Sequence, residues 1–447
     1  MANQLSISLY DDLISSFDDT AISGTRSETV QKAREKGLQN FKKLGFPTRR
    51  NEEWKYTNIT PYLQEKYLVD NTHASTSQNE LVSKALIPHL DCYKIVLVNG
   101  QLQTSQNGVS IPSFVKVQAI SEAQKDEAFS TYFSRGTYME EFPFSALNTA
   151  MFSDGLFIEI SANAVLEKPL HVVHVFTTGD DNVFIQPRHL VIVHKGASLN
   201  LIESVVSKNS TSKIFVNCLT EVFLEENATC DHYVLQIAES GTRLVTATEV
   251  SQVRNSIYSN YTFSLPSADI IRNNLHLSLN DKDTETHLFG LYLGAGKQLI
   301  DNHSLVNHKM PHCNSNEIYK GVLTESSVGV FNGKIYVQPD AQKTNAFQKN
   351  NNLLLGDKSS VNSKPQLEIF ADDVKCSHGS TVGQLSKEAM FYLQSRGIGE
   401  QKARALLVNA FLFDVTEKIK ISELEEYVNQ LITRHIPLDE TVTADVE

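Results

Sequence analysis

A thiol and an imidazole stand two residues apart near the end of the chain, in residues 370–379 with the sequence FADDVKCSHG. If this segment is extended, alternate side chains share a face, so Cys376 and His378 lie on the same side of the strand. Sulfur and imidazole donors suit iron, zinc or copper better than the hard cations that carboxylates prefer. Because two donors do not complete a metal site, we expect the others to come from elsewhere in the fold or from another chain.

A second group of candidate ligands lies in residues 301–313, with the sequence DNHSLVNHKMPHC. The spacing of its three histidines and Cys313 matches no closed zinc motif, and Pro311 opposes a helix that would carry both His308 and His312. We therefore favour a structural role, with histidines hydrogen-bonding between neighbouring segments.

Residues 290–297, with the sequence GLYLGAGK, resemble a phosphate-binding loop. The spacing is one residue too long, and Gln298 stands where a serine or threonine would bind magnesium. We reject a nucleotide site here, so any ATP must be bound and hydrolysed by another polypeptide.

The elements that position these residues are mostly strands. From about Leu156 to Val382, short alternating or apolar runs are separated by Gly, Asn, Asp, Ser and Pro, which is typical of strands. Pairs of small residues precede several of the expected strands: Asn163-Ala164, Gly196-Ala197, Asn227-Ala228, Ser267-Ala268, Gly294-Ala295, Ser326-Ser327 and Ser359-Ser360. The second residues of successive pairs are 33, 31, 40, 27, 32 and 33 positions apart. A repeat of about thirty residues without intervening helices favours a β-solenoid, with a large β-sandwich as the alternative.

Both ends of the chain have helical patterns. Residues 29–44 carry apolar side chains at helical spacing, Ser386 is a candidate helix cap, residues 400–413 form a second amphipathic run, and 422–425 fit a capping box. The single tryptophan, Trp54, is expected to anchor a packed corner, and the polar run 71–80 reads as a linker. The chain thus divides into an N-terminal helical region (1–70), a linker with a mixed α/β lead-in (71–150), a β-core (151–383) and a C-terminal helical region (384–447).

Composition sets further limits on function. The 447 residues carry a formal net charge of -12, which disfavours general nucleic-acid binding and anionic membrane surfaces. The five cysteines are an odd number without an export signal, and no stretch approaches the roughly 20 apolar residues of a membrane span. We expect a cytoplasmic protein without a disulfide framework, no nucleic-acid partner and no membrane partner.

Four motifs together resemble the SufB/SufD family of iron-sulfur cluster assembly scaffolds. They are RRNEEWKYT at 49–57, KCSHGSTVG at 375–383, SRGI at 395–398 and ARALL at 403–407. The Cys-Ser-His-Gly tetrapeptide is similar to that of the SufD branch, whereas the SufB branch usually carries Cys-Glu-His-Glu. Because the resemblance covers nearly the whole chain in order and spacing, it is much more specific than one tetrapeptide.

This resemblance implies a fold and a function. The fold is a right-handed parallel β-helix between helical ends. The function is that of a non-catalytic scaffold subunit, which pairs with SufB through its β-helix edge and binds the SufC ATPase through its C-terminal helices. A transient Fe-S cluster forms at the partner interface, with reduced flavin associated with the complex only, and the isolated chain could form a homodimer.

The resemblance also ranks the site residues. His378 matches a histidine that faces a SufB cysteine, so it is the leading candidate iron ligand. Cys376 is second, because the essential cysteine belongs to SufB and because Asp372 and Asp373 would raise the pKa of its thiol. Cys313, in a run similar to one in SufD relatives, is a secondary candidate for sulfur handling.

Two other readings stay open. Long β-solenoids often bind or cleave polysaccharides, but Asp372 and Asp373 are neighbours that point to opposite faces and cannot pair as catalytic carboxylates. A stand-alone metal-binding homodimer is the other reading. Metal retained in stoichiometric amounts without SufB would support it.

Overall fold

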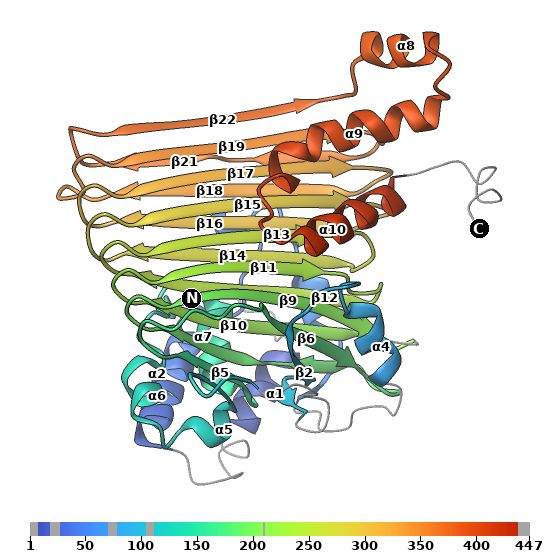
Figure 1. Ribbon diagram of the computed structural model, residues 1–447. Coiled ribbons are helices and arrows are strands. Elements are labelled where there is room, and N and C mark those ends of the chain that lie inside the picture. Colours follow the sequence, from blue (N-terminus) through green and yellow to red (C-terminus); the bar gives the residue numbers. More distant parts are fainter. Residues whose placement is uncertain (1–7, 18–26, 70–77, 104–110, 209–210, 437–447) are drawn as a thin grey trace.

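The protein is a β-solenoid flanked by helices (Figure 1). A computed structural model describes residues 8–17, 27–69, 78–103, 111–208 and 211–436. Two sheets, with strands of successive turns paired in parallel, wind through about eight turns. The solenoid prediction is therefore confirmed, and the β-sandwich alternative is wrong, because sandwich sheets are antiparallel.

Each turn of the solenoid contributes to both sheets. Sheet A consists of β1 (Leu68–Val69), β4 (Val115–Ala119), β5 (Gly155–Ile160), β7 (Val183–Ile185), β8 (Arg188–Val193), β10 (Ile214–Leu224), β12 (Thr242–Gln252), β14 (Ile270–Leu279), β16 (Leu299–His308), β18 (Val328–Val337), β20 (Ser360–Ser363) and β21 (Gln366–Ile369). Sheet B consists of β2 (Tyr93–Val98), β3 (Gln101–Leu102), β6 (Leu170–Thr177), β9 (Ser198–Lys208), β11 (Thr229–Gln236), β13 (Ile257–Ser264), β15 (Glu285–Gly294), β17 (Asn314–Leu323), β19 (Asn345–Leu354) and β22 (Lys375–Gly383).

Equivalent residues of successive turns stack in columns. In sheet B one column begins the strands at Ser198, Thr229, Ile257, Glu285, Asn314, Asn345 and Lys375, so these turns are 31, 28, 28, 29, 31 and 30 residues long. Because side chains alternate along a strand, every second column faces the lumen between the two sheets. The main apolar core fills this lumen.

The small-residue pairs that repeat along the sequence lie at two different corners of the solenoid turn. Before sheet B, one residue per turn takes a left-handed conformation with φ between 57° and 67°: Asn163, Gly196, Asn227, Asn255, Asp283, His312 and Lys343. Asn, Asp and Gly tolerate this conformation best, which explains most of these choices. The first three pairs recognised in the sequence belong to this corner and the last four to the opposite corner, before sheet A. The expected spacing of 40 is therefore a change of corner, not a longer turn.

Helices cover the outer faces of both sheets. On sheet A, apolar residues of the N-terminal helices pack against Phe184, Phe215 and Val245. The helices of this end of the chain are α1 (Ser8–Ser16), α2 (Glu28–Leu44), α3 (Thr60–Leu63), α4 (Gln78–Ala85), α5 (Ile120–Ala123), α6 (Glu127–Tyr132) and α7 (Pro143–Met151). Of the polar run 71–80, residues 71–77 lie outside the described part of the chain.

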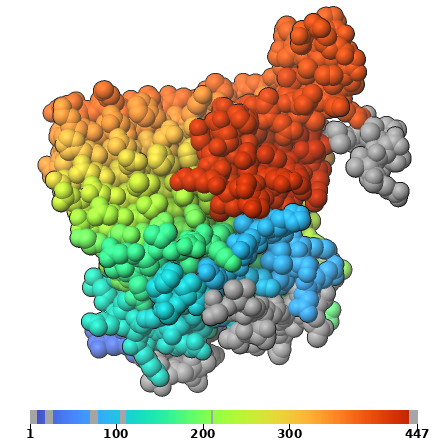
Figure 2. All heavy atoms as spheres, viewed as in Figure 1, coloured from blue at the N-terminus to red at the C-terminus, as the bar shows by residue number. Residues whose placement is uncertain are grey.

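The C-terminal helices are α8 (Lys387–Ser395), α9 (Glu400–Thr416) and α10 (Ser422–His435). Apolar residues of α9 and α10 pack against the outer face of sheet B, where Tyr233 and Tyr261 stack at 4.4 Å between ring centroids. By contrast, α8 has no buried residue and projects beyond β22 (Figures 1 and 2). No helix in the described ranges is long and apolar enough to cross a membrane.

Most helix predictions are confirmed, and one is wrong. The pattern at 29–44 is α2, the pattern at 400–413 is α9, and the side chain of Ser386 caps α8 by accepting the backbone N–H of Ala389 at 3.1 Å. The expected capping box fails because α10 already begins at Ser422, with Ile421 as its N-cap, and the Ser422 hydroxyl donates to Glu423 instead.

Trp54 anchors the N-terminal segment to sheet A, as predicted. Its side chain is buried, and the Arg272 guanidinium lies 3.7 Å from the centroid of its ring. The same guanidinium donates to Asp301 at 2.5 Å, and Thr57 donates to the same carboxylate. His303, which also contacts Asp301 at 2.9 Å, completes a buried cluster that joins the 49–57 motif to two turns of the solenoid.

We expect Asp301→Asn to lower the free energy of unfolding by about 3–5 kcal/mol, because it leaves the buried Arg272 charge unpaired. Burial alone would raise the pKa of Asp301, but the charges of Arg272 and His303 outweigh burial and hold this pKa well below its ordinary value. The ionised Asp301 carboxylate therefore stabilises the folded state fully above about pH 4, near the pKa of Asp301 in the unfolded chain. This contribution declines as the pH falls further toward the pKa of Asp301 in the folded protein.

Urea unfolding of the two proteins at pH 7 and at pH 3 measures this effect. Asp340→Asn, at an exposed turn position, is the matched control and should change stability by less than about 0.5 kcal/mol. An Asp301→Asn protein as stable as the parent at pH 7 would contradict the assignment.

Candidate metal-ligating site

The two ends of the solenoid differ: the outermost strands at the N-terminal end are antiparallel and partly buried, whereas the last strand, β22, is open and exposed. At the N-terminal end, β4 and β3 pair antiparallel with β5 and β2 and end the parallel stack. At the C-terminal end, β22 pairs with β19, while β20 and β21 pair with β18. Among the described residues no further strand follows, so each sheet ends in an unpaired edge. Edge strands of this kind are ready to pair with another chain.

Cys376 and His378 lie on β22 at this open edge. The register aligns Cys376 with Ala346 and His378 with Gln348, and both of these residues are buried in lumen-facing columns. The prediction that the thiol and the imidazole share one face is therefore confirmed. Their surroundings differ, because Cys376 is half-buried against Ala346 and its apolar neighbours whereas His378 is exposed.

Burial, not the neighbouring aspartates, controls the Cys376 thiol. Burial raises its pKa, and a hydrogen bond with the Ala346 backbone opposes the rise only in part. The direction of the predicted shift is confirmed, but its expected cause is wrong: Asp372 and Asp373 do not contribute, and Asp373 forms an ion pair with Lys343. At neutral pH the thiol is therefore protonated and a weaker metal ligand than a thiolate.

The rest of the chain does not complete a metal site around this pair. Across the described ranges, no group of three or more His, Cys, Asp or Glu side chains is arranged to hold a metal ion. His378 and Cys376 thus remain two donors at an open edge, the arrangement in which a second polypeptide would have to supply the missing ligands.

Cys313 occupies a corner position that small residues fill in other turns. The equivalent buried residues are Ala197, Ala228, Ser256, Thr284 and Thr344. The Cys313 thiol contacts the carbonyl oxygen of Asp281 at 3.3 Å, and burial raises its pKa. A structural role accounts for this residue, and sulfur handling by Cys313 stays a prediction.

The histidines of residues 301–313 have structural contacts, as expected. His308 faces the lumen, with Nε2 2.9 Å from the Ser315 hydroxyl, and His312 is a left-handed corner residue. His303 faces outward, where it contacts Asp301 and lies 3.3 Å from Glu53. The three rings therefore point to three different environments.

Residues 290–297 do not form a phosphate-binding loop. Gly290 to Gly294 end strand β15, Gly296 turns the corner with φ of 61°, and the next element is strand β16. A phosphate-binding loop needs a helix N-terminus at this point, so the rejection is confirmed.

Two buried residues beneath His378 belong to no motif of the sequence. The register aligns His378 with Gln348 and Gln348 with Glu317, and the two lower side chains lie in the lumen. Gln348 Nε2 donates to Glu317 Oε2 at 2.7 Å. The signal was present in the sequence: these residues are separated by 30 and 31 positions, the length of a turn.

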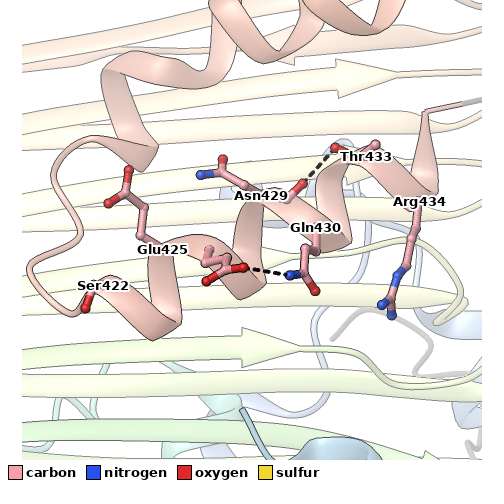
Figure 3. A pocket seen from close by; sticks show the side chains of 7 residues that line it. Ser422, Glu425, Asn429, Gln430, Thr433 and Arg434 are labelled. Atoms are coloured by element: carbon pink, nitrogen blue, oxygen red, sulfur yellow. Dashed lines mark hydrogen bonds between the residues drawn. The ribbon is translucent and has the colours of Figure 1, made fainter. Parts of the chain in front are cut away.

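The C-terminal helices carry a second candidate surface. Figure 3 shows a polar hollow on α10, lined by Ser422, Glu425, Glu426, Asn429, Gln430, Thr433 and Arg434. A neighbouring hollow between α9 and α10 includes Phe413, and large apolar side chains are exposed on α8 and α9 at Phe391, Tyr392, Leu406 and Phe413. Exposed aromatic side chains beside polar ones are typical of protein interaction surfaces.

Comparison with known proteins identifies the family. The family model described as "SUF system FeS cluster assembly, SufBD core domain" matches residues 175–411, and "SufBD protein N-terminal region" matches residues 6–172. A SufBD family iron-sulfur cluster assembly protein of Synechocystis is 31% identical over 428 residues, which are 93% of each chain.

Two relatives are named iron-sulfur cluster assembly protein SufD. The Escherichia coli protein is 28% identical over 90% of this chain and 92% of its own, and the Bacillus subtilis protein is 25% identical over 86% of this chain and 88% of its own. The solenoid, the open edge and these matches lead to one conclusion: the chain belongs to the SufB/SufD family of the SUF iron-sulfur cluster assembly system.

Proposed function

We propose that this chain is a scaffold subunit that pairs through its open solenoid end with SufB, and that a nascent Fe-S cluster forms as cargo at their junction. The observation that carries the proposal is the unpaired last turn, in which β22 presents His378 to solvent. Phe370 and Val382 of the same end are 57% and 53% exposed, so a partner would bury apolar surface and pair backbone groups together. Without SufB, a second copy of the chain could occupy the same edge.

In this proposal His378 is the principal donor from this chain. A neutral imidazole is a good ligand for iron, and the exposed ring is free to meet donors from SufB. Cys376 is a weaker candidate because its thiol is protonated and turned toward the core. Cys313 is buried two turns below the edge, so a part for it in sulfur handling would require opening of the corner.

The C-terminal helices are the proposed site for the SufC ATPase. Because α9 and α10 already bury their apolar residues against sheet B, their outer surfaces and α8 are what a partner would contact. The exposed Phe391 and Tyr392 of α8, at 73% and 58%, are suitable anchors because truncated aromatic contacts often cost most in interfaces.

The chain itself is proposed to be non-catalytic. ATP hydrolysis is assigned to SufC, and the closure of SufC on ATP would move the C-terminal helices and reshape the SufB junction. Reduced flavin is placed in the assembled complex only, without an assigned residue of this chain. A cytoplasmic location is part of the same proposal, although one relative, from Arabidopsis thaliana, is named as chloroplastic.

We expect His378→Ala to lower cluster formation by the complex with SufB and SufC about tenfold or more, because it removes a proposed ligand of the cargo iron. Anaerobic reconstitution followed by visible absorbance measures the yield. Ser377→Ala is the matched control, since Ser377 is exposed on the opposite face of the same strand. Both proteins should unfold at the parent temperature, and an unchanged yield with His378→Ala would refute the ligand role.

We expect the double substitution Phe391→Ser with Tyr392→Ser to weaken SufC binding by about 2 kcal/mol, or roughly thirtyfold in Kd, because it removes two exposed aromatic anchors. Titration calorimetry against purified SufC measures the affinity. The variant suits the test better than truncation, which would also uncover the apolar face of sheet B. Val165→Ser, at a 61% exposed site in an early corner, is the control. An unchanged Kd would exclude α8 from the interface.

A further inference from the structure

The lumen beneath His378 contains a short polar column on an apolar floor. Below His378, Gln348 and Glu317 occupy the same column in the two preceding turns of sheet B, with exposed fractions of 3% and 2%. The next residue down the column is Leu288, with an exposed fraction of 0%. Neighbouring strands lie about 4.8 Å apart, so each side chain in this column stacks directly on the next. The column therefore reaches the open end of the solenoid at His378.

The Gln348 side chain makes one hydrogen bond and has an acceptor that is not used. Its Nε2 donates to Glu317 Oε2 at 2.7 Å, whereas its buried Oε1 has no hydrogen-bond partner among the described residues. A buried amide oxygen without a donor is costly, by about 1–3 kcal/mol. The residue stacked above this amide is His378, whose ring carries an N–H in either neutral tautomer.

The opposite sheet makes room for this amide. Across the lumen, sheet A has a glycine at Gly333, and a Cβ added there would lie 2.1 Å from Gln348 Nε2. Any larger residue would push the amide away from Glu317. Gly333 therefore leaves the space that the Gln348 amide occupies, and the Glu317 carboxylate binds the amide there.

The carboxylate also determines which end of the Gln348 amide faces Glu317. An ionised carboxylate only accepts hydrogen bonds, so it requires the NH₂ group of Gln348 and repels the carbonyl oxygen. Rotation of the amide by half a turn would break the bond to Glu317. Burial raises the pKa of Glu317 to about 7, and the nearby Ser304 hydroxyl and the hydrogen bond from Gln348 oppose this rise. At pH 8 the carboxylate form predominates.

We propose that Gln348, held by Glu317 and Gly333, is a positioning residue for His378: Gln348 Oε1 accepts the N–H of the imidazole and leaves the other ring nitrogen unprotonated and directed outward. A free neutral imidazole exchanges between two tautomers, and a fixed acceptor selects one of them. The same device, a hydrogen bond to the far ring nitrogen, orients histidines that bind metals. The claim that this tautomer helps His378 to bind cargo iron rests on the proposed function. The claim that Gln348 selects the tautomer does not.

The direct test is the tautomer of His378 in the full-length chain. Protein labelled with ¹⁵N-histidine is examined by NMR at pH 8, and the His378 signals are assigned by their loss in His378→Gln. We expect one nitrogen at the protonated position and one at the unprotonated position. In Gln348→Leu and in Gly333→Ala we expect averaged shifts, because the acceptor is lost or displaced.

Two further variants separate positioning from simple stability. Glu317→Gln keeps the size of the side chain but can donate as well as accept, so it no longer selects one end of the Gln348 amide, and we expect averaged shifts in this variant too. Lys349→Leu, on the outward face of β19 beside Gln348, is the matched control and should preserve a single tautomer. Thermal unfolding identifies any variant that fails to fold, and Gln348→Leu and Gly333→Ala reach the same prediction by independent changes. Averaged shifts in the parent chain, or a single tautomer in Gln348→Leu, would overturn the proposal.

Cluster assembly with SufB and SufC separates this inference from the proposed function. If both are right, Gln348→Leu lowers the rate of cluster formation about tenfold while Lys349→Leu leaves it unchanged. If His378→Ala has no effect on assembly but the tautomer depends on Gln348, the metal role is wrong and the positioning stands. If His378→Ala abolishes assembly but the tautomer is indifferent to Gln348, the positioning is wrong and the metal role stands.

Discussion

Each turn of this solenoid is covered by the turn above it, whereas the last turn has no turn above it among the described residues. Parallel pairing satisfies backbone N–H and C=O groups from turn to turn, and the stacked columns bury the lumen. At β22 both requirements stop together: one edge of the strand is unpaired, and the lumen-facing residues His378 and Val382 are exposed. Burial and hydrogen bonding can still be gained at this end, and we propose that a second polypeptide supplies them.

Part of the remaining surface of the core is already covered. Helices pack on the outer faces of both sheets, and antiparallel strands end the stack at the first turns. The Trp54 cluster ties the N-terminal segment to the middle of sheet A, so this covering is fixed by buried charge as well as by apolar contact. Among the described residues, the last turn and the C-terminal helices α8 and α9 leave several large apolar side chains exposed. These two places are where partners are proposed.

The sequence was most informative where physical signals are local. Turn residues with left-handed backbone, such as Asn227 and Gly196, mark corners wherever they occur, so the solenoid could be predicted without knowing which corner each belongs to. Assigning corners needed the register, which depends on pairing between residues about thirty apart. The same long-range register conceals Glu317 and Gln348, which look like ordinary strand residues until they are stacked beneath His378.

The failures have physical causes too. Ser422 fits a capping box by pattern, but the helix begins at that residue, because packing against sheet B and not capping sets the start of α10. For Cys376, adjacent aspartates in the sequence suggested an electrostatic effect on the thiol, yet burial against Ala346 dominates. Burial depends on the turn beneath the strand and cannot be read from neighbours along the chain. Exposure of His378 was likewise decided by the missing turn above it.

Amide hydrogen exchange of residues 375–383, in the isolated chain and in its complex with SufB, tests the central claim most directly. If the open edge of β22 is the site of pairing, backbone amides that exchange rapidly in the isolated chain become strongly protected in the complex, while amides in the inner turns change little. A complex that forms with full affinity but leaves exchange in residues 375–383 unchanged would contradict the account.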